Sequence, residues 1–382
     1  MLCFLPQAKI QFVPDGLSSL TTVGGSLIIN TMAPDPSEGL SGLTIVGGDI
    51  EIESTGIPNL DVFAGFTSTA GDLVITDNDD LTNIDGLSSL NSVGGSLDIS
   101  DNDTLRNLNG LSSLTTVVGD LKISDGRVGD IYSWDDPVII NHLDGLSSLT
   151  SVGGTLEIQS IHDLANIDGL SSLTDLGNLA IIDNDELTNI DGLSSLTSVR
   201  ENLNIQANSN LEDIDGLSAL TDLGGDLTIW SDVTNVDGLS SLTALPGNLE
   251  ISSIAGLTNV DGLSNLTSVG GNLNIRRSIS VESIDGLASL NTIGGDLLLE
   301  HAFYVSNLDA LTSLESIGGK LQISNMNQLT NIEGLNSVTS IGGDIRFNDN
   351  SQLCRSLVVA FGESMTLLGW LGSLTYPGTK FC

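Results

Sequence analysis

The sequence predicts an all-β fold, a single elongated parallel β-solenoid of about 14 turns. The segment from Ile84 to Leu90, Ile-Asp-Gly-Leu-Ser-Ser-Leu, recurs almost unchanged from Ile167 to Leu173 and from Ile190 to Leu196. The residue after the acid recurs about every 24 positions, with one longer interval of 35. A fixed period in the range of about 20 to 50 residues is typical of solenoids, in which each turn buries its apolar side against its neighbours.

Each unit contains one predicted strand. In the segment Gly94-Gly95-Ser96-Leu97-Asp98-Ile99, apolar and polar residues alternate, which is the period of a half-buried strand. We expect Leu97 and Ile99 to point inward and Asp98 outward. The preceding glycine pair recurs in most units, and we expect it to form a tight corner with positive φ, a conformation that glycine adopts without steric cost.

The repeats define the domain organisation. We expect a repeat solenoid over residues 1–353, with an insertion at about 124–138, and a C-terminal cap over residues 354–382. Residues 356–361 are predicted to form a short helix over the open end of the coil, because an uncovered last turn exposes core and an unpaired strand edge. The chain enters a repeat almost at once, so we expect an N-terminal cap to be missing, from a processed or truncated chain.

Charge excludes several classes of partner. The chain has 49 acidic and 11 basic residues and a formal net charge of −38. A nucleic-acid binder needs cations to contact phosphates, so no nucleic-acid partner is expected, and attraction to an anionic membrane is disfavoured. No apolar run approaches the roughly 18 residues that span a bilayer, so no transmembrane segment is expected.

The unit that runs from Leu81 to Ile99 resembles the repeat of the receptor L domain, and the resemblance extends from about Ile10 to Leu353. It implies a right-handed coil related to leucine-rich repeats, a fold of growth-factor receptor ectodomains, fungal cell-wall proteins and bacterial surface proteins. One turn departs from the pattern, because Arg200 and Glu201 replace the glycine pair. Receptor signalling is not implied, since no cysteine-rich module or kinase accompanies the repeats.

In thirteen of the fourteen units an acid stands directly before the residue, usually glycine, whose recurrence defines the period, and Asn109 replaces the acid in the remaining unit. Stacked carboxylates about 4.8 Å apart repel unless a hard cation such as Ca²⁺ bridges them. Alternatively, each side chain caps the backbone N–H groups of the Gly-Leu-Ser turn that follows, and an asparagine serves equally well for that purpose. No cofactor is expected on the second interpretation, and Ca²⁺ is the cofactor on the first. The acids are Asp15, Glu38, Asp61, Asp85, Asp144, Asp168, Asp191, Asp215, Asp237, Asp261, Asp285, Asp309 and Glu333.

A column of threonines follows the second leucine of the motif in eleven of fourteen turns, with Thr67 and Thr267 as examples. A regular threonine row on a flat face is a candidate ice-binding surface. The alternative is that β-branched threonine stacks with its own kind between turns. The next position does not repeat, since it runs from Thr22 through Ile45 to Asp175, and this favours the structural interpretation.

The outward strand position varies from turn to turn, and such a face is where repeat proteins usually bind partners. Scarce aromatic and cationic residues also gather just past the strands and in the insertion, and such residues anchor protein or carbohydrate contacts. The alternative for both groups is local packing along an edge of the coil. The predicted ligand-binding residues are Tyr132, Trp134, Asp135, Asp136, Trp230, Arg276, Arg277, His301 and Tyr304.

A catalytic function is not expected. The three histidines, His142, His162 and His301, fall in separate turns, and no nucleophile motif is present. A polysaccharide-active β-helix enzyme needs convergent acids in a cleft, and an acidic surface repels pectin-like substrates.

Cysteines indicate the compartment. Cys354 and Cys382 bracket the cap, and a disulfide between them implies an oxidising compartment. The sequons at Asn102 and Asn265 are compatible with secretion. The sequence therefore predicts an extracellular or cell-surface module for recognition or adhesion, which binds protein or carbohydrate at a cell surface or cell wall without catalysis.

Overall fold

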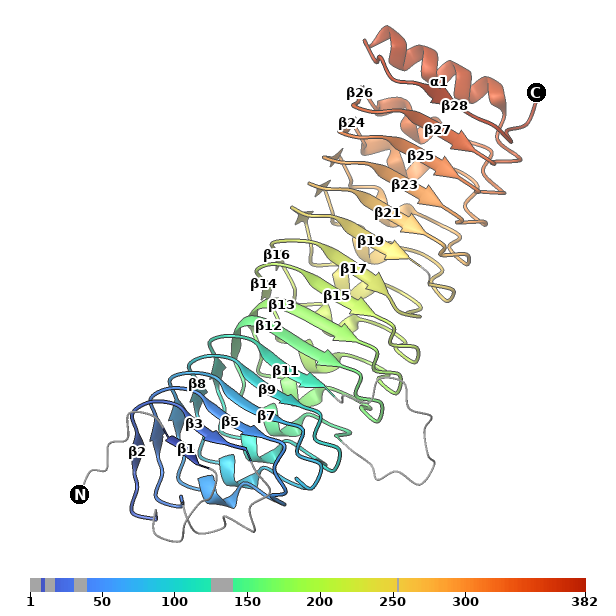
Figure 1. Ribbon diagram of the computed structural model, residues 1–382. Helices are drawn as coiled ribbons and strands as arrows, with labels where there is room; N and C mark the ends of the chain where they lie inside the picture. Colours follow the sequence, from blue (N-terminus) through green and yellow to red (C-terminus); the bar gives the residue numbers. More distant parts are fainter. Residues whose placement is uncertain (1–7, 11–17, 31–39, 125–139, 253) are drawn as a thin grey trace. The chain divides into compact units, whose positions relative to one another are not determined.

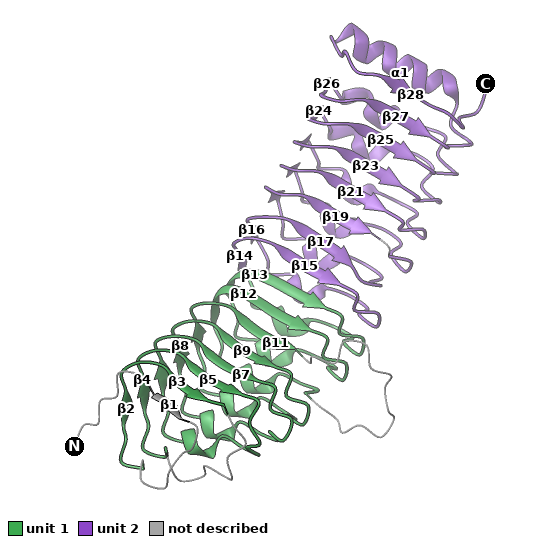
Figure 2. Ribbon diagram, in the orientation of Figure 1, with its two compact units in different colours: residues 1–196 green, residues 197–382 purple. Residues whose placement is uncertain are grey.

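The computed structural model describes residues 8–10, 18–30, 40–124, 140–252 and 254–382 (Figure 1). The chain divides into two compact units, residues 1–196 and 197–382 (Figure 2).

Both units are stacks of parallel turns, which confirms the predicted solenoid. A turn has a four-residue strand, a 3₁₀ helix and a two-residue strand at a corner, and each strand pairs in parallel with its counterpart one turn away. In unit 1, Leu73 aligns with Leu97 and Ile75 with Ile99. The insertion leaves this register intact, because Leu121 aligns with Leu156 and Ile123 with Ile158 across it. Residues at equivalent places in successive repeats are thus paired with each other in the sheet.

Unit 1 contains thirteen strands and six 3₁₀ helices among its described residues. The main strands are β1 (Ala8–Ile10), β3 (Leu27–Ile29), β5 (Ile50–Glu53), β7 (Leu73–Thr76), β9 (Leu97–Ser100) and β11 (Leu121–Ser124), the corner strands are β2 (Thr22–Val23), β4 (Ile45–Val46), β6 (Ser68–Thr69), β8 (Ser92–Val93) and β10 (Thr116–Val117), and β12 (Ser151–Gln159) and β13 (Asp175–Ile182) run through the corner. The helices are η1 (Asp61–Phe63), η2 (Asp85–Leu87), η3 (Asn109–Leu111), η4 (Asp144–Leu146), η5 (Asp168–Leu170) and η6 (Asp191–Leu193).

Unit 2 repeats this plan and ends in an α-helix. Its main strands are β15 (Leu203–Gln206), β17 (Leu227–Trp230), β19 (Leu249–Ser252), β21 (Leu273–Arg276), β23 (Leu297–Glu300), β25 (Leu321–Ser324), β27 (Ile345–Asn348) and β28 (Leu374–Thr375), and its corner strands are β14 (Ser198–Val199), β16 (Asp222–Leu223), β18 (Ala244–Leu245), β20 (Ser268–Val269), β22 (Thr292–Ile293), β24 (Ser316–Ile317) and β26 (Ser340–Ile341). The helices are η7 (Asp215–Leu217), η8 (Asp237–Leu239), η9 (Asp261–Leu263), η10 (Asp285–Leu287), η11 (Asp309–Ser313), η12 (Glu333–Ser337) and α1 (Arg355–Leu367). No helix of the described residues is long and apolar enough to cross a bilayer.

The core consists of the leucines, isoleucines and valines of the repeat. Leu97 and Ile99 are buried and Asp98 is half-buried on the outside, as predicted. Leu87 and Leu90 of the same turn are also buried, so each unit supplies apolar side chains from its strand and from its 3₁₀ helix. Burial against the neighbouring turns replaces the single central core of a globular domain.

The glycine of the Asp-Gly-Leu motif is required by close packing between turns. A Cβ atom at Gly262 would overlap the carbonyl oxygen of Val236, and one at Gly192 would overlap that of Ile167. A Cβ at these two positions therefore requires the backbone of the neighbouring turn to shift.

The prediction of positive φ at the glycine-pair corners is wrong. Among the described glycines, only Gly369 and Gly378 have positive φ. The corner glycines instead make room for backbone, because a Cβ at Gly294 would overlap the carbonyl oxygen of Gly270. The left-handed conformation lies just past the main strands, on residues that are not glycine: Ser54, Asp77, Asp101, Ser160, Asp183, Ala207, Arg277, His301, Asn325 and Asp349.

Polar side chains join each turn to the next. Ser113 donates its hydroxyl to the carbonyl of Ser88, at 2.7 Å, which accounts for the second serine of the motif. After the corner, the Asp72 carboxylate accepts the backbone N–H of Ser96, at 2.7 Å. Such bonds satisfy backbone groups at the edges of short strands, where the ladder alone leaves them unpaired.

Buried asparagines add an internal column. Asn78 is fully buried, accepts the backbone N–H of Thr55 at 3.0 Å, and donates to the carbonyls of Ile52 and Thr76 at 2.9 and 2.8 Å. Asn350 repeats the arrangement in unit 2, where it accepts from Met326 and donates to Ile323. These side chains hold the bend after the strands that they follow, and the other buried asparagines of the column are Asn102, Asn184 and Asn208.

The last turn is capped, and the predicted helix over it is confirmed. Helix α1 buries Val358, Phe361 and Met365, and the Phe361 ring meets that of Phe347 edge-on, with 6.3 Å between centroids. Strand β28 pairs with β27 and thereby covers the edge of the last full strand.

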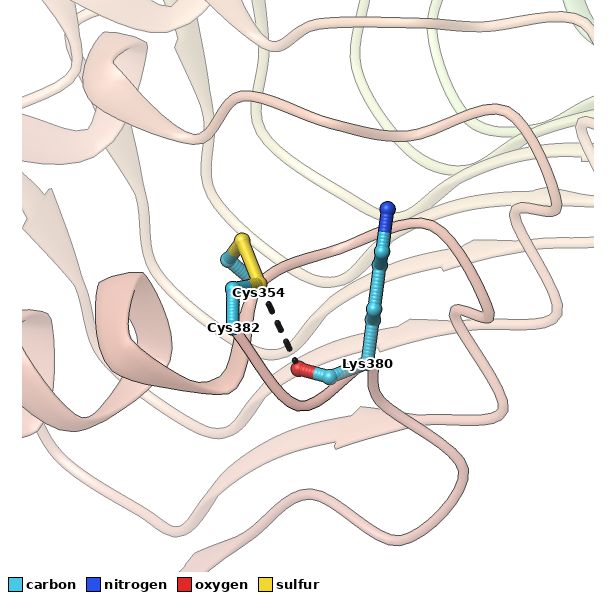
Figure 3. The surroundings of a disulfide bond; sticks show 3 residues. All are labelled: Cys354, Lys380 and Cys382. Carbon is cyan, nitrogen blue, oxygen red and sulfur yellow. Dashed lines mark hydrogen bonds between the residues drawn. A yellow bond between two sulfur atoms is a disulfide. The ribbon is translucent and has the colours of Figure 1, made fainter.

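The end of the cap is tied back to its beginning. Cys354 and Cys382 form a disulfide with a Cα–Cα distance of 5.7 Å, between the two cysteines paired in the sequence analysis. Figure 3 shows Lys380 beside it, with its carbonyl oxygen 3.6 Å from the Cys382 sulfur. The Arg355 guanidinium lies over the Tyr376 ring, 4.6 Å from its centroid, which holds the final segment against α1.

Candidate ligand-binding face

The outward residues of the main strands of unit 2 form a continuous polar surface, here called the strand face. Each main strand from β15 to β27 contributes its second and fourth residues, while its first and third are buried, as in the pattern of β21. Two of the fourth residues, Ser252 of β19 and Ser324 of β25, are covered by their neighbours and buried. The strand face consists of Asn204, Gln206, Thr228, Trp230, Glu250, Ser252, Asn274, Arg276, Leu298, Glu300, Gln322, Ser324, Arg346 and Asn348.

Trp230 is the exposed aromatic residue of the strand face. It ends β17, aligns with Gln206 of β15, and is 44% exposed. A large apolar ring held by a strand and open to solvent is typical of a contact residue, because its position is fixed before a partner arrives.

Arg276 lies two strands further along, in β21. Its guanidinium forms an ion pair and a hydrogen bond with Glu250 of β19. The Arg276 Nε atom is buried and has no hydrogen-bond partner. The pair therefore holds the guanidinium over the sheet while part of its donor capacity stays unused.

The other predicted residues of unit 2 lie on the loops after the strands. Arg277 and His301 occupy the left-handed positions that follow β21 and β23, with φ of 54° and 60°. The His301 Nδ1 atom lies 3.9 Å from the Glu300 carboxylate, and Tyr304 is 52% exposed. No hydrogen bond, ion pair or ring contact links these loop residues to Trp230 or Arg276 within the described part of unit 2. The predicted set thus separates into a strand-face group and a loop-edge group, which consists of Arg277, His301 and Tyr304.

Four predicted ligand-binding residues, Tyr132, Trp134, Asp135 and Asp136, lie in the insertion, outside the described residues.

At the described helices η1 to η12, the acid column does not cap the turn that follows it, so the capping interpretation is wrong there. The Leu87 N–H donates to the main-chain carbonyl of Ile84, and no side-chain cap is present at η2. The side chain that accepts a backbone N–H at the start of the turn is instead that of Asn83, two residues before the acid, which accepts from Asp85 at 3.2 Å. The same bond joins Asn259 to Asp261 and Asn307 to Asp309. The described residues also contain no group of three or more His, Cys, Asp or Glu side chains placed to hold a metal ion.

The threonine column uses its hydroxyl groups within the protein. Thr67 donates to the carbonyl of Thr44 at 3.1 Å, and Thr267 donates to that of Thr243 at 2.8 Å. In these turns the hydroxyl proton is therefore committed to the neighbouring turn, a role that the stacking interpretation of the column does not include.

Two features of the strand face were missed by sequence reasoning. The Asn204 Oδ1 atom and the Ser324 hydroxyl are buried without a hydrogen-bond partner. A hollow of about 210 Å³ is also present, lined by residues that include Asn274, Asp296 and Gln322. The sequence signal for the hollow was the period itself, because residues one period apart, such as Asn274, Leu298 and Gln322, lie on adjacent strands.

Comparison with known proteins supports the fold. Residues 241–361 match the family described as Receptor L domain. This confirms the resemblance over that segment. The receptor L domain segment contains five of the seven main strands of the strand face, from β19 to β27.

Among solved structures, the chain is similar to an internalin from Listeria monocytogenes. The two are 19% identical, with a TM-score of 0.44, and the match covers 81% of this chain and 82% of the internalin chain. A comparison with curated proteins finds no match.

Proposed function

We propose that this protein is a non-catalytic recognition or adhesion module that binds a partner on its strand face. The observation that carries the proposal is the contrast between columns of the repeat. The inward residues of unit 2 are almost all Leu, Ile or Val, whereas the strand-face positions differ from turn to turn and include an exposed tryptophan. A column that packing does not restrict, on a rigid scaffold, is available for binding.

An extracellular or cell-surface location is part of the proposal. The disulfide between Cys354 and Cys382 supports it, because disulfides persist mainly in oxidising compartments. The acidic composition also supports it, since a large net charge keeps an exposed protein soluble. The receptor L domain match is compatible with this location.

The test is a binding screen with two matched double variants. The purified chain is measured by surface plasmon resonance against immobilised extracellular domains and cell-wall glycans. Trp230→Ala/Arg276→Ala removes one aromatic ring and one cation from the strand face. Arg277→Ala/Tyr304→Ala removes the same two kinds of group from the loop edge.

We expect saturable binding to at least one immobilised ligand. The strand-face variant should weaken it by about 30-fold or more, the effect of losing a central aromatic or arginine contact, and the loop-edge variant by less than about threefold. Equal losses in the two variants would place the contact elsewhere, and no saturable binding to any ligand would refute the recognition function.

A further inference from the structure

The strand face of unit 2 is electrically balanced in a strongly acidic protein. Its fourteen residues include two acids, Glu250 and Glu300, and two arginines, Arg276 and Arg346. The aligned outward residues of β5 to β13 in unit 1 include four acids, Glu51, Glu53, Asp98 and Glu157, against the single cation Lys122. Unit 2 thus presents a face without net charge, although the whole chain carries −38. Such a face does not select a charged ligand.

The neutral side chains of this face are rich in amides. Asn204, Gln206, Asn274, Gln322 and Asn348 all lie on it, and each amide both donates and accepts hydrogen bonds. Hydroxyl groups also donate and accept, so an amide surface matches a ligand that carries many hydroxyls. The outward side chains of successive strands form rows at a regular spacing of about 4.8 Å, the distance between neighbouring strands of a sheet.

Trp230 provides an apolar surface within this polar field. Its neighbours are Gln206 in the aligned position and Thr228 two residues earlier in the same strand. The face of an indole ring packs against the C–H groups of a sugar ring while the hydroxyls point outward to polar side chains. Trp230 and Leu298 are the two large apolar residues of the strand face. That is too little apolar surface for the core of a protein–protein interface, which is mainly apolar.

Several polar groups of the face have no partner within the protein. The Asn204 Oδ1 and Arg276 Nε atoms are buried and unpaired, although both side chains are half-buried as a whole and reach the surface. Buried polar atoms are nearly always paired in folded proteins, so two such atoms on one face indicate groups that a ligand satisfies.

A hollow lies on the same face, and its lining begins at Asn274, in the strand that carries Arg276. It has a volume of about 210 Å³, and its lining combines the amides of Asn274 and Gln322, the apolar side chain of Leu298, and the ion pair of Lys320 with Asp296 at 3.2 Å. Asn274, Leu298 and Gln322 align across β21, β23 and β25. An apolar side chain among groups that donate and accept hydrogen bonds is suited to one unit of a polyhydroxylated chain.

The geometry points to a binding site for an uncharged saccharide chain on the strand face, with Trp230 as the stacking residue and Glu250, Asn274, Arg276 and Gln322 as hydrogen-bonding residues. The inference rests on the proposed recognition function and names its ligand class. Anionic polysaccharides are disfavoured by the net charge of the protein, and a protein ligand by the small apolar area of the face.

The test is isothermal titration calorimetry of the full chain with six sugars of defined charge. Four are uncharged, namely the hexamers of β-1,4-glucose, β-1,3-glucose, mannose and N-acetylglucosamine. Hexagalacturonate is the anionic probe and a glucosamine hexamer is the cationic one. The variants are Trp230→Ala, Trp230→Phe, which keeps an aromatic face, and Tyr304→Ala, which removes an exposed aromatic from the loop edge.

We expect at least one uncharged hexamer to bind saturably and more tightly than both charged probes. Trp230→Ala should weaken this binding by about tenfold or more, Trp230→Phe by less than about threefold, and Tyr304→Ala should leave it unchanged. The inference is overturned if no uncharged hexamer binds, if a charged probe binds best, or if Trp230→Ala binds as the parent does. If a protein ligand from the first screen still depends on Trp230 and Arg276 while no sugar binds, the recognition function stands and the saccharide inference fails.

Discussion

Replacement of Asn78 by leucine tests whether the buried asparagine column stabilises the turns. Leucine keeps the approximate volume, and Ile161 fills the equivalent position of another turn in the same unit, where it is 1% exposed. The change removes the acceptor for the Thr55 N–H and hydroxyl, and the donor for the Ile52 and Thr76 carbonyls and the Asn102 side-chain oxygen. An unpaired buried polar group costs about 1–3 kcal/mol, and the lower value applies where carbonyls keep a second lone pair, so the three backbone groups alone give about 3 kcal/mol.

The assay is urea denaturation combined with hydrogen exchange. A loss of about 3 kcal/mol should lower the free energy of unfolding of unit 1, and the Thr55 amide should exchange about 100-fold faster. Asn83→Leu is the matched control, because Asn83 is half-buried and accepts one backbone N–H, from Asp85, for which about 1 kcal/mol is expected. Equal losses in the two variants, or a loss below about 1 kcal/mol for Asn78→Leu, would refute the view that this column holds the bends.

Three further predictions concern the packing, the cap and the charge of the solenoid. Gly262→Ala should destabilise the protein by about 2 kcal/mol or more in urea denaturation, because the new Cβ overlaps the Val236 carbonyl. Gly256→Ala is the control and should cost less than about 1 kcal/mol, since the atom nearest to its new Cβ is 3.6 Å away. Reduction of the Cys354–Cys382 disulfide, which closes a loop of 28 residues, should cost about 3–4 kcal/mol on a chain-entropy estimate, and a cap whose helical circular dichroism melts at an unchanged temperature after reduction would contradict it. Burial, followed by the nearby Asp77 carboxylate, raises the pKa of Asp101, so its ionised form destabilises the fold and stability should be regained as the pH falls through that raised pKa. Asp101→Asn should therefore be more stable than the parent at pH 7, with the difference shrinking toward about pH 3, and a difference that does not change with pH would argue against this cause.

The predictable part of the fold depends on the period. A spacing of about 24 residues fixes which side chains stack, so burial of Leu97 and Ile99 follows from the sequence. The acid column shows where this reasoning stops. A carboxylate near a turn and an asparagine two residues before it are both good caps, and composition does not decide which one reaches the backbone N–H. In the structure the acceptor is Asn83 rather than Asp85.

The candidate site was predictable only in part, for a related reason. Trp230 and Arg276 stand out because such residues are scarce in this chain. Arg277, only one position further, belongs to the loop edge, because the strand ends at Arg276 and the next residue turns into the left-handed region. Sequence neighbours therefore separate onto two surfaces at the strand end. The pairing of Arg276 with Glu250 follows from the register of adjacent strands together with side-chain conformation, and scarcity alone does not indicate it.

The side chains that join neighbouring turns have a consequence for how this protein changes length. Many turns offer the same donors to the turn before them and accept the same donors from the turn after them, as the bonds of Ser113 and Thr267 illustrate. A duplicated turn can enter the stack without any new kind of contact. The deletion of a whole turn leaves no donor or acceptor of this kind without a partner. Gene duplication can thus lengthen the binding surface one row at a time, while point mutation alters the chemistry of each row independently of the scaffold beneath it.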